Sequence, residues 1–301
     1  MVLATLPPAL QSAGQPSSGE PSIFGRLSRL PAFRPATRNL LTISLESESA
    51  VSDFESAFSM DAALAADLLG LANSPLFGLR TQVLTIRHAI AMLGLETVRS
   101  LALTITMTSY WQKARWNDAI RGPWRHSVAT AVIAEALGAA DTTRGPLLYT
   151  GGLMHDIGRL ALFQISPAKY QQILATEFAS TQEYLTRENL LFDCGHDDAG
   201  AFLAMAWGFP IPLCDCIRFH HWEIAAHAGQ LFELVGTACR LADALGYPEV
   251  RRADVDQSEN AIATLLPPRL RGMAQLNPDT LRFKVEAQFA ALSPKPSAGT
   301  N

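Results

Sequence analysis

The sequence predicts an all-α protein in which a helical N-terminal lobe is followed by a second helical lobe. Three observations support this fold class. From about residue 38 onward apolar residues recur at the spacing of a helix, and no segment alternates apolar and polar residues convincingly with a period of two. Helix caps and glycine or proline stops divide the pattern into segments of helical length. The chain has 301 residues, of which 48% are hydrophobic, so it can bury a sizeable core.

The N-terminal segment, residues 1–35, is predicted to be disordered or only loosely docked. Residues 1–22 are mainly proline, serine, glycine, glutamine and alanine, which bury too little apolar surface to offset the entropy of ordering. Residues 23–33 carry apolar side chains at roughly helical spacing. We therefore expect the second stretch to dock on the body or on a partner.

The first lobe is predicted over residues 36–115. A stripe of leucines follows Asp61, whose carboxylate can cap the start of a helix. A second helix is expected after Thr85 and up to Gly94, and a third over residues 96–111, where the apolar residues fall on one face. These three helices form the core of the first lobe.

The rest of the chain is also expected to be helical, without strands. Gly151, Gly152 and Gly158 fall inside one of these helices, where each costs about 1 kcal/mol relative to alanine. Other backbones or a ligand should therefore come close to them. The expected helices span residues 117–139, 145–163, 181 towards 196, 196–207, 212 through the pair His220-His221, 231–245 and 279–292.

Charge and cysteine content exclude several functional classes. The net charge of -4 and the pI near 6.0 argue against nucleic-acid binding, because phosphate neutralisation needs clustered lysine and arginine. The four cysteines are not spaced like a disulfide framework, which indicates a reducing compartment. We see no signal peptide and no apolar run of the roughly 18 residues that span a membrane. The expectation is a cytoplasmic protein without membrane contact.

A possible metal centre is suggested by His155-Asp156, a pair set in an apolar segment where unpaired ionisable groups are costly. Imidazole and carboxylate together are ligands for Zn, Fe, Mn or Ni. Adjacent helical residues diverge by about 100°, so the pair suits an ion in a groove between helices, or a carboxylate that bridges two ions. Two such ions can clamp a phosphate and activate water. The candidate ligands are His126, His155, Asp156, His196, His220, His221 and Asp243.

Four ordered segments resemble a known family. His126, His155-Asp156 and Asp243 resemble the signature of the HD phosphohydrolase superfamily. The stretch LLGLANSPLFGLRTQVLTIRHAIAMLGLETVRSLAL resembles the N-terminal half of HDOD domains, the HD-related output domains of bacterial signalling proteins. GGLMHDIGRLAL, GHDDAGAFLAMAWGFP and CIRFHHWE continue the likeness in order. The resemblance implies an HDOD domain over 36–250, with an HD-like lobe over 116–250 and a C-terminal helical extension and tail over 251–301.

The resemblance implies a regulatory module that acts through protein partners of a signalling pathway. The positions of His196 and of the pair His220-His221 resemble those of the second-metal ligands of HD-GYP phosphodiesterases. Arg159 replaces the lysine that contacts phosphate in that class, and arginine can hold phosphate with different geometry. The GYP motif expected after the histidine pair is absent from HHWEIAAHAGQ, and Gly246-Tyr247-Pro248 reads as a helix stop.

The leading hypothesis is therefore a cytoplasmic bacterial output module that binds one or two metal ions without robust catalysis. The alternative is a metal-dependent phosphohydrolase, or a phosphodiesterase of nucleotides or cyclic dinucleotides, with Asp156 and Arg159 as catalytic residues. Two simpler interpretations stay open. His155 and Asp156 could form a structural polar core, or Cys216 and His220 could form a structural zinc site with Cys194 and His196.

Overall fold

The computed structural model describes residues 21–113, 118–141, 145–222 and 231–292, and it is helical almost throughout this part. The first lobe holds α3 (Pro35–Thr42), α4 (Ala50–Ser59), α5 (Ala62–Ala72), α6 (Ile86–Leu93) and α7 (Leu95–Lys113). The second holds α8 (Asp118–Asp141), α9 (Gly145–Met154), α10 (Ile157–Ile165), α11 (Pro167–Ala175), α12 (Thr181–Phe192), α13 (His196–Ala206), α14 (Ile211–Phe219), α15 (Leu231–Ala244) and α16 (Glu259–Leu265). Short 3-10 turns, η1 (Pro268–Leu270) and η2 (Ala274–Leu276), lead into α17 (Pro278–Leu292).

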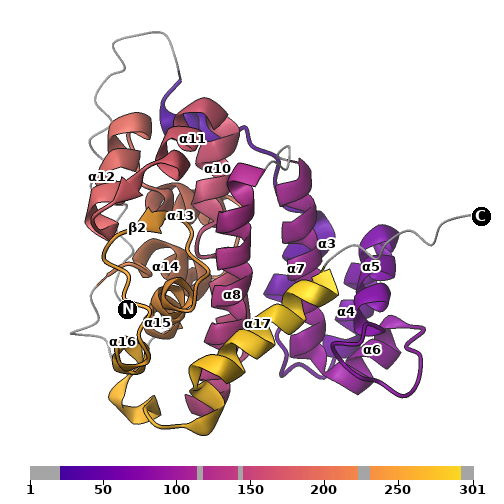
Figure 1. Cartoon of the computed structure of the whole chain (residues 1–301). Helices are drawn as coiled ribbons and strands as arrows, with labels where there is room; N and C mark the ends of the chain where they lie inside the picture. Colours follow the sequence, from indigo (N-terminus) through magenta and orange to yellow (C-terminus); the bar gives the residue numbers. More distant parts are fainter. Residues whose placement is uncertain (1–20, 114–117, 142–144, 223–230, 293–301) are drawn as a thin grey trace, which may run out of the picture.

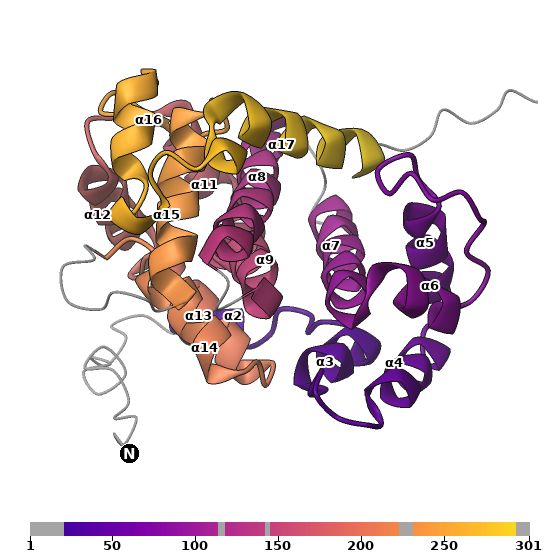
Figure 2. The ribbon, with the colours of Figure 1, turned by 90° about the horizontal axis from the view of Figure 1, so that it is seen from below.

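Two hydrophobic cores lie in the described part of the chain. One core lies among α3 to α7, and the larger one among α8 to α17 together with α2 (Ile23–Leu27). Helix α7 contributes to both, because Leu101 faces the first core and Leu103 the second. Figures 1 and 2 show α3 to α7 grouped on one side and α17 extending from the second group towards the first. The all-α prediction is confirmed.

Several helix ends form where local chemistry predicts them. The Asp61 carboxylate accepts a hydrogen bond from the Leu64 amide, and the Thr85 hydroxyl accepts one from the His88 amide. Gly94 ends α6 with φ 83°, a conformation that residues with a Cβ rarely adopt. These interactions stabilise the helix ends without help from the second lobe.

Three details differ from the expectations. The helix expected over 145–163 is interrupted at His155-Asp156, between α9 and α10. The pair His220-His221 follows the last residue of α14 instead of lying within the helix. A two-residue parallel pair, β1 (Glu177–Phe178) with β2 (Arg251–Arg252), joins segments far apart in sequence. Strands this short have no recognisable period in the sequence.

The N-terminal segment is only partly within the described residues. Most of the stretch predicted to be disordered, residues 1–20, lies outside them, as does the tail from 293 onward. Helix α2 packs on the larger core through the fully buried Leu27, and Arg26 Nη2 donates to the Ile165 carbonyl over 2.9 Å. The structure therefore places residues 23–27 on the body.

Gly152 and Gly158 lie where helices of the second lobe touch. A Cβ on Gly152 would come within 2.8 Å of the Thr130 carbonyl oxygen in α8, and one on Gly158 within 1.8 Å of the His196 carbonyl oxygen in α13. Both contacts are with backbone, which cannot rotate away. Glycine at these positions therefore permits the close packing that brings the histidines together.

No single helix among the described residues is long and apolar enough to cross a bilayer. One pair, Ile86–Leu93 with Leu95–Tyr110, reaches that length and composition only when joined, and it is bent by 118°.

Candidate metal centre

The centre is built around the break between α9 and α10, where His155 and Asp156 leave the helix. His155 Nδ1 lies 2.6 Å from the Gly152 carbonyl oxygen. We assign the proton to Nδ1, because a carbonyl can only accept, so that Nε2 carries a lone pair. Burial lowers the pKa of His155 to about 3, which keeps this nitrogen neutral.

Four histidines share this arrangement, in which Nδ1 faces an oxygen and Nε2 points into the cluster. The acceptors of the other three are the Tyr247 carbonyl, the Glu188 carboxylate and the Ile217 carbonyl, at 2.7, 2.6 and 2.8 Å from His126, His196 and His220 respectively. A second-sphere acceptor of this kind fixes the tautomer of metal-ligating histidine. All four Nε2 atoms are therefore oriented as ligands.

The Nε2 atoms face one another at short range. The distance between the two Nε2 atoms is 3.3 Å for His126 and His155 and 3.3 Å for His196 and His220. It is 3.1 Å for His196 and His221. Lone pairs at this distance repel unless a proton or a cation lies between them. Two nitrogens bound to one ion at about 2.1 Å each lie roughly 3.0 to 3.4 Å apart. The spacing therefore fits a metal ion.

The Asp156 carboxylate lies between two groups of candidate ligands. Oδ1 is 3.2 Å from His196 Nε2 and 3.6 Å from His220 Nε2, whereas Oδ2 is 3.5 Å from His155 Nε2 and 4.0 Å from His126 Nε2. Each oxygen thus faces a different pair of histidines. Among the described residues three groups of candidate ligands occur, and two of them flank this carboxylate: Asp156, His196, His220 and His221 form one, and His126, His155 and Cys239 form the other. The third group is His126, Asp243 and Glu249.

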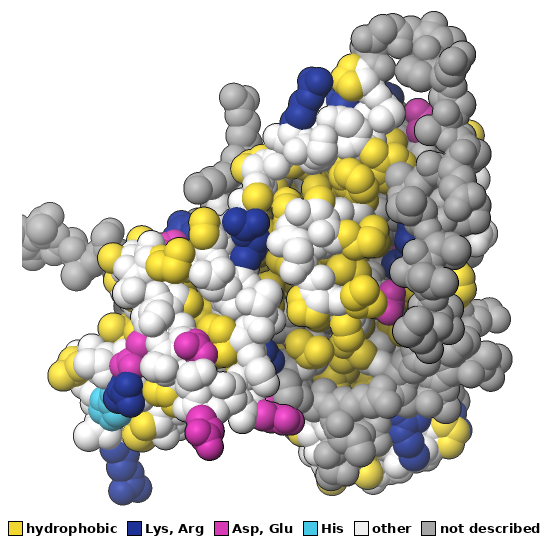
Figure 3. Space-filling model, turned by 180° about the vertical axis from the view of Figure 1, so that it is seen from behind, with side chains coloured by type: hydrophobic (Ala, Val, Ile, Leu, Met, Phe, Trp, Pro, Cys, Tyr) yellow, Lys and Arg dark blue, Asp and Glu magenta, His cyan; other side chains and the backbone are white. Residues whose placement is uncertain are grey.

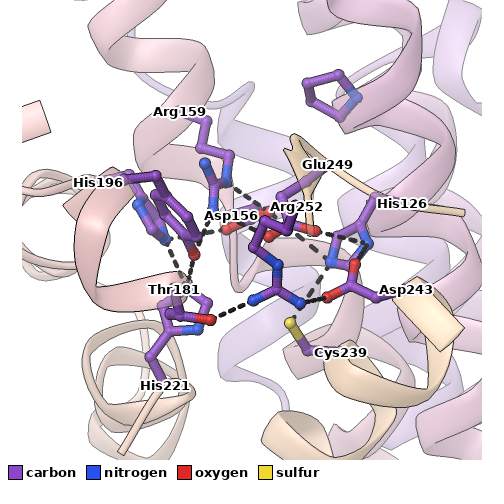
Figure 4. A network of polar contacts seen from close by, with 12 residues as sticks. His126, Asp156, Arg159, Thr181, His196, His221, Cys239, Asp243, Glu249 and Arg252 are labelled. Atoms are coloured by element: carbon purple, nitrogen blue, oxygen red, sulfur yellow. Dashed lines mark hydrogen bonds and ion pairs between the residues drawn. The ribbon is translucent and has the colours of Figure 1, made fainter. Parts of the chain in front are cut away.

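Asp243 lies on the opposite side of His126 from this carboxylate. Its Oδ1 is 3.3 Å from His126 Nδ1, and Glu249 Oε2 is 3.4 Å from the same nitrogen. Its Oδ2 pairs with Arg252 (Figure 4). The structure therefore brings Asp243 to His126 but groups it with Glu249, and it groups His155 and Asp156 with other residues. In this position Asp243 orients the His126 ring.

Arg159 lies inside the cluster and is only 1% exposed. Its Nε is 2.8 Å from Asp156 Oδ2, its Nη1 is 3.4 Å from Glu188 Oε1, and its Nη2 donates to the Tyr184 hydroxyl over 2.9 Å. Its guanidinium also lies over the Tyr184 ring. These contacts use the donors that a phosphate would need, so the observed role of Arg159 is to neutralise buried carboxylates.

The carboxylates and guanidinium groups of the centre sum to an excess of negative charge. Asp156, Glu188, Asp243 and Glu249 supply four carboxylates against the guanidinium groups of Arg159 and Arg252, which leaves -2 if all are ionised. Burial and the adjacent Glu249 raise the pKa of Asp243 to about 8. Burial and Arg159 lower the pKa of His196, but Glu188 and Asp156 raise it to about 9. Without metal, protons offset this charge; a divalent cation would do the same.

Glu188, Cys239, Glu249 and Arg252 belong to the centre although the ligand pattern does not predict them. Cys239 lies one turn before Asp243 on α15, so helical periodicity places both on one face and could have revealed it. Glu249 follows the turn at Gly246, where φ is 96°, and reaches the site only because the chain reverses there. No local signal predicts that contact.

The alternative zinc site is not formed by the described residues. All four cysteines are free and buried, and neither Cys194 nor Cys216 joins a group of candidate ligands in this part of the chain. Their positions fit the packing of small apolar side chains.

A protein-family model covers most of the chain. Residues 30–223 match the model of the HDOD domain. The chain belongs to the HDOD family. A Treponema pallidum protein is 28% identical over 207 residues, which cover 66% of this chain but only 39% of that protein, so this HDOD chain spans well under half of its relative.

Solved structures share the HDOD fold at low identity. An HDOD domain protein of unknown function from Geobacter sulfurreducens is 20% identical, with a TM-score of 0.67 over 88% of this chain and 94% of its own. A candidate phosphohydrolase from Shewanella amazonensis is 23% identical, with a TM-score of 0.65 over 89% and 94%. A candidate signal transduction protein from Marinobacter aquaeolei is 19% identical, with a TM-score of 0.68 over 94% and 64%. These likenesses establish the fold alone.

Proposed function

We propose that this HDOD protein is a bacterial signal-transduction output module whose second lobe binds one or two divalent transition metal ions, and that it acts through protein partners without robust catalysis. The main support for a module without robust catalysis is that the candidate ligands are buried. His126, His155 and His196 are 0% exposed and Asp156 is 1% exposed. A catalytic metal needs a position that substrate can reach, and burial of all four residues argues against one.

The proposed ions are held by the two groups around Asp156. Imidazole and carboxylate suit Zn, Fe, Mn or Ni, whereas Mg and Ca prefer oxygen ligands. The histidines come from α8, from the break after α9, from α13 and from the end of α14. An ion bound there would join four segments and stabilise the folded state.

Action through a protein partner has support from the surface. The face in Figure 3 shows hydrophobic side chains gathered near its centre, with charged side chains mostly towards its margins. Contiguous apolar surface on a folded protein commonly marks an interaction site. A cytoplasmic location and a role in a bacterial signalling pathway belong to the same proposal.

A metal-dependent phosphohydrolase is the second candidate, and the position of Asp156 favours it. A carboxylate between two ligand groups is the arrangement of two-metal sites that hydrolyse phosphate esters. The substrate would be a nucleotide or a cyclic dinucleotide, and Arg159 would have to leave its buried ion pairs to contact phosphate.

Two measurements test these proposals. Metal analysis of protein purified without oxygen should find a transition metal at stoichiometric amounts, and its absence would remove both metal-dependent proposals. The metal-loaded protein should show negligible hydrolysis of nucleotides and cyclic dinucleotides. Turnover that disappears in Asp156→Ala, but persists in a variant outside the centre such as Gly70→Ala, would replace the first proposal with the second.

A further inference from the structure

Cys239 lies beside the paired histidines His126 and His155. Its Sγ lies 3.5 Å from His126 Nε2, and the candidate ligand atoms of the three residues all lie within 4.8 Å of one another. The side chain is 3% exposed. Figure 4 shows its sulfur pointing into the cluster from α15. Asp243, one turn further along α15, faces the other nitrogen of His126.

A thiol hydrogen bond explains only part of this arrangement. The single S–H proton can satisfy His126 Nε2, and the Thr130 hydroxyl, 3.4 Å away, faces that same nitrogen. Neither supplies a proton to His155 Nε2, whose ring donates through Nδ1 to the Gly152 carbonyl. An ion held by both nitrogens and the sulfur would satisfy all three atoms at once.

We propose that Cys239 is a thiolate ligand of the ion held by His126 and His155, while Asp243 positions His126. The inference rests on the proposed metal binding and adds the identity of a ligand. On binding, the S–H bond breaks, a sulfur–metal bond forms and the proton passes to solvent. Sulfur selects softer ions, so this position takes Zn²⁺, Fe²⁺ or Co²⁺ in preference to Mg²⁺ or Mn²⁺.

Cobalt substitution tests the ligand directly. Full-length metal-free protein is titrated with Co²⁺ without oxygen, and the near-ultraviolet thiolate-to-cobalt charge-transfer band is recorded. We expect the band in the unaltered protein and in Cys216→Ser, a fully buried cysteine outside both ligand groups. Cys239→Ser should lose the band. Asp243→Asn should keep it with weaker binding. Retention of the band in Cys239→Ser would overturn the inference.

X-ray absorption of the zinc-loaded unaltered protein tests the same ligand if Cys239→Ser does not fold. A sulfur neighbour at about 2.3 Å is expected, and a first shell of nitrogen and oxygen alone would overturn the inference. If metal binds without sulfur, the thiolate ligand is wrong and the proposed metal-binding function stands. If no metal binds, both fail.

Discussion

Replacing Gly158 by alanine tests the close contact that forms the centre. The new Cβ would lie 1.8 Å from the His196 carbonyl oxygen and 2.7 Å from the Gly200 amide nitrogen, whereas non-bonded heavy atoms pack at about 3.5 Å. Helices α10 and α13 must therefore move apart by more than about 1 Å. Overpacking of cores costs about 1 to 3 kcal/mol and occasionally more. Because the backbones of two helices are in contact here, we expect Gly158→Ala to lower the unfolding free energy by at least about 3 kcal/mol.

Urea unfolding of the metal-free protein measures this cost. The matched control is Gly70→Ala in α5, where no atom lies within 4 Å of the new Cβ and the substitution should raise stability by up to about 1 kcal/mol. Gly158→Ala should also weaken metal binding, because the backbone that is displaced carries His196. A Gly158→Ala protein with unchanged unfolding free energy and unchanged metal affinity would refute the packing described for α10 and α13.

Three further results are expected. Removing metal with a chelator should lower the unfolding midpoint, since ligands of the native state stabilise it; an unchanged midpoint would contradict the proposed centre. Because Glu188 and Asp156 hold His196 protonated without metal, metal affinity should rise between pH 6.5 and about 9, and a flat profile in competition titrations would contradict this. Glu188→Gln should weaken binding by about 10- to 100-fold, as outer-sphere changes do; equal affinity would exclude that role.

The sequence predicts those parts of the fold that local residues determine. Asp61, Thr85 and Ser180 each accept the amide hydrogen bond expected of a helix cap. Gly94 and Gly208 end helices with positive φ. Because these interactions lie within a few residues of one another, they are visible in a single sequence without knowledge of the tertiary contacts.

The helix break at His155-Asp156 is not visible in the same way. The apolar pattern runs through both α9 and α10, so periodicity predicts one continuous helix. In the structure the His155 side chain bonds to the Gly152 carbonyl, a group that a regular helix would use for its own backbone. This competition depends on where the imidazole is held, and that depends on helices distant in sequence.

The candidate site was predicted in its residue types more fully than in its geometry. Spacing and the HDOD resemblance point to the histidines and Asp156, which the structure brings together. They do not predict the orientation of α15, which places Cys239 beside His126 Nε2 and Asp243 beside His126 Nδ1. Glu249 arrives through the turn after α15, so its contribution arises from tertiary structure alone.

The outer edge of the centre separates the two proposed functions. His221 is the half-buried member of its ligand group, and its Nε2 lies 2.6 Å from the Tyr184 hydroxyl. Arg159 donates to that same hydroxyl, so Tyr184 links the edge of the centre to the buried ion pairs. A substrate that entered between His221 and Tyr184 would break this hydrogen bond and disturb Arg159, leaving buried carboxylates less compensated at a cost of several kcal/mol. That cost favours a closed, regulatory metal centre over an open, catalytic one.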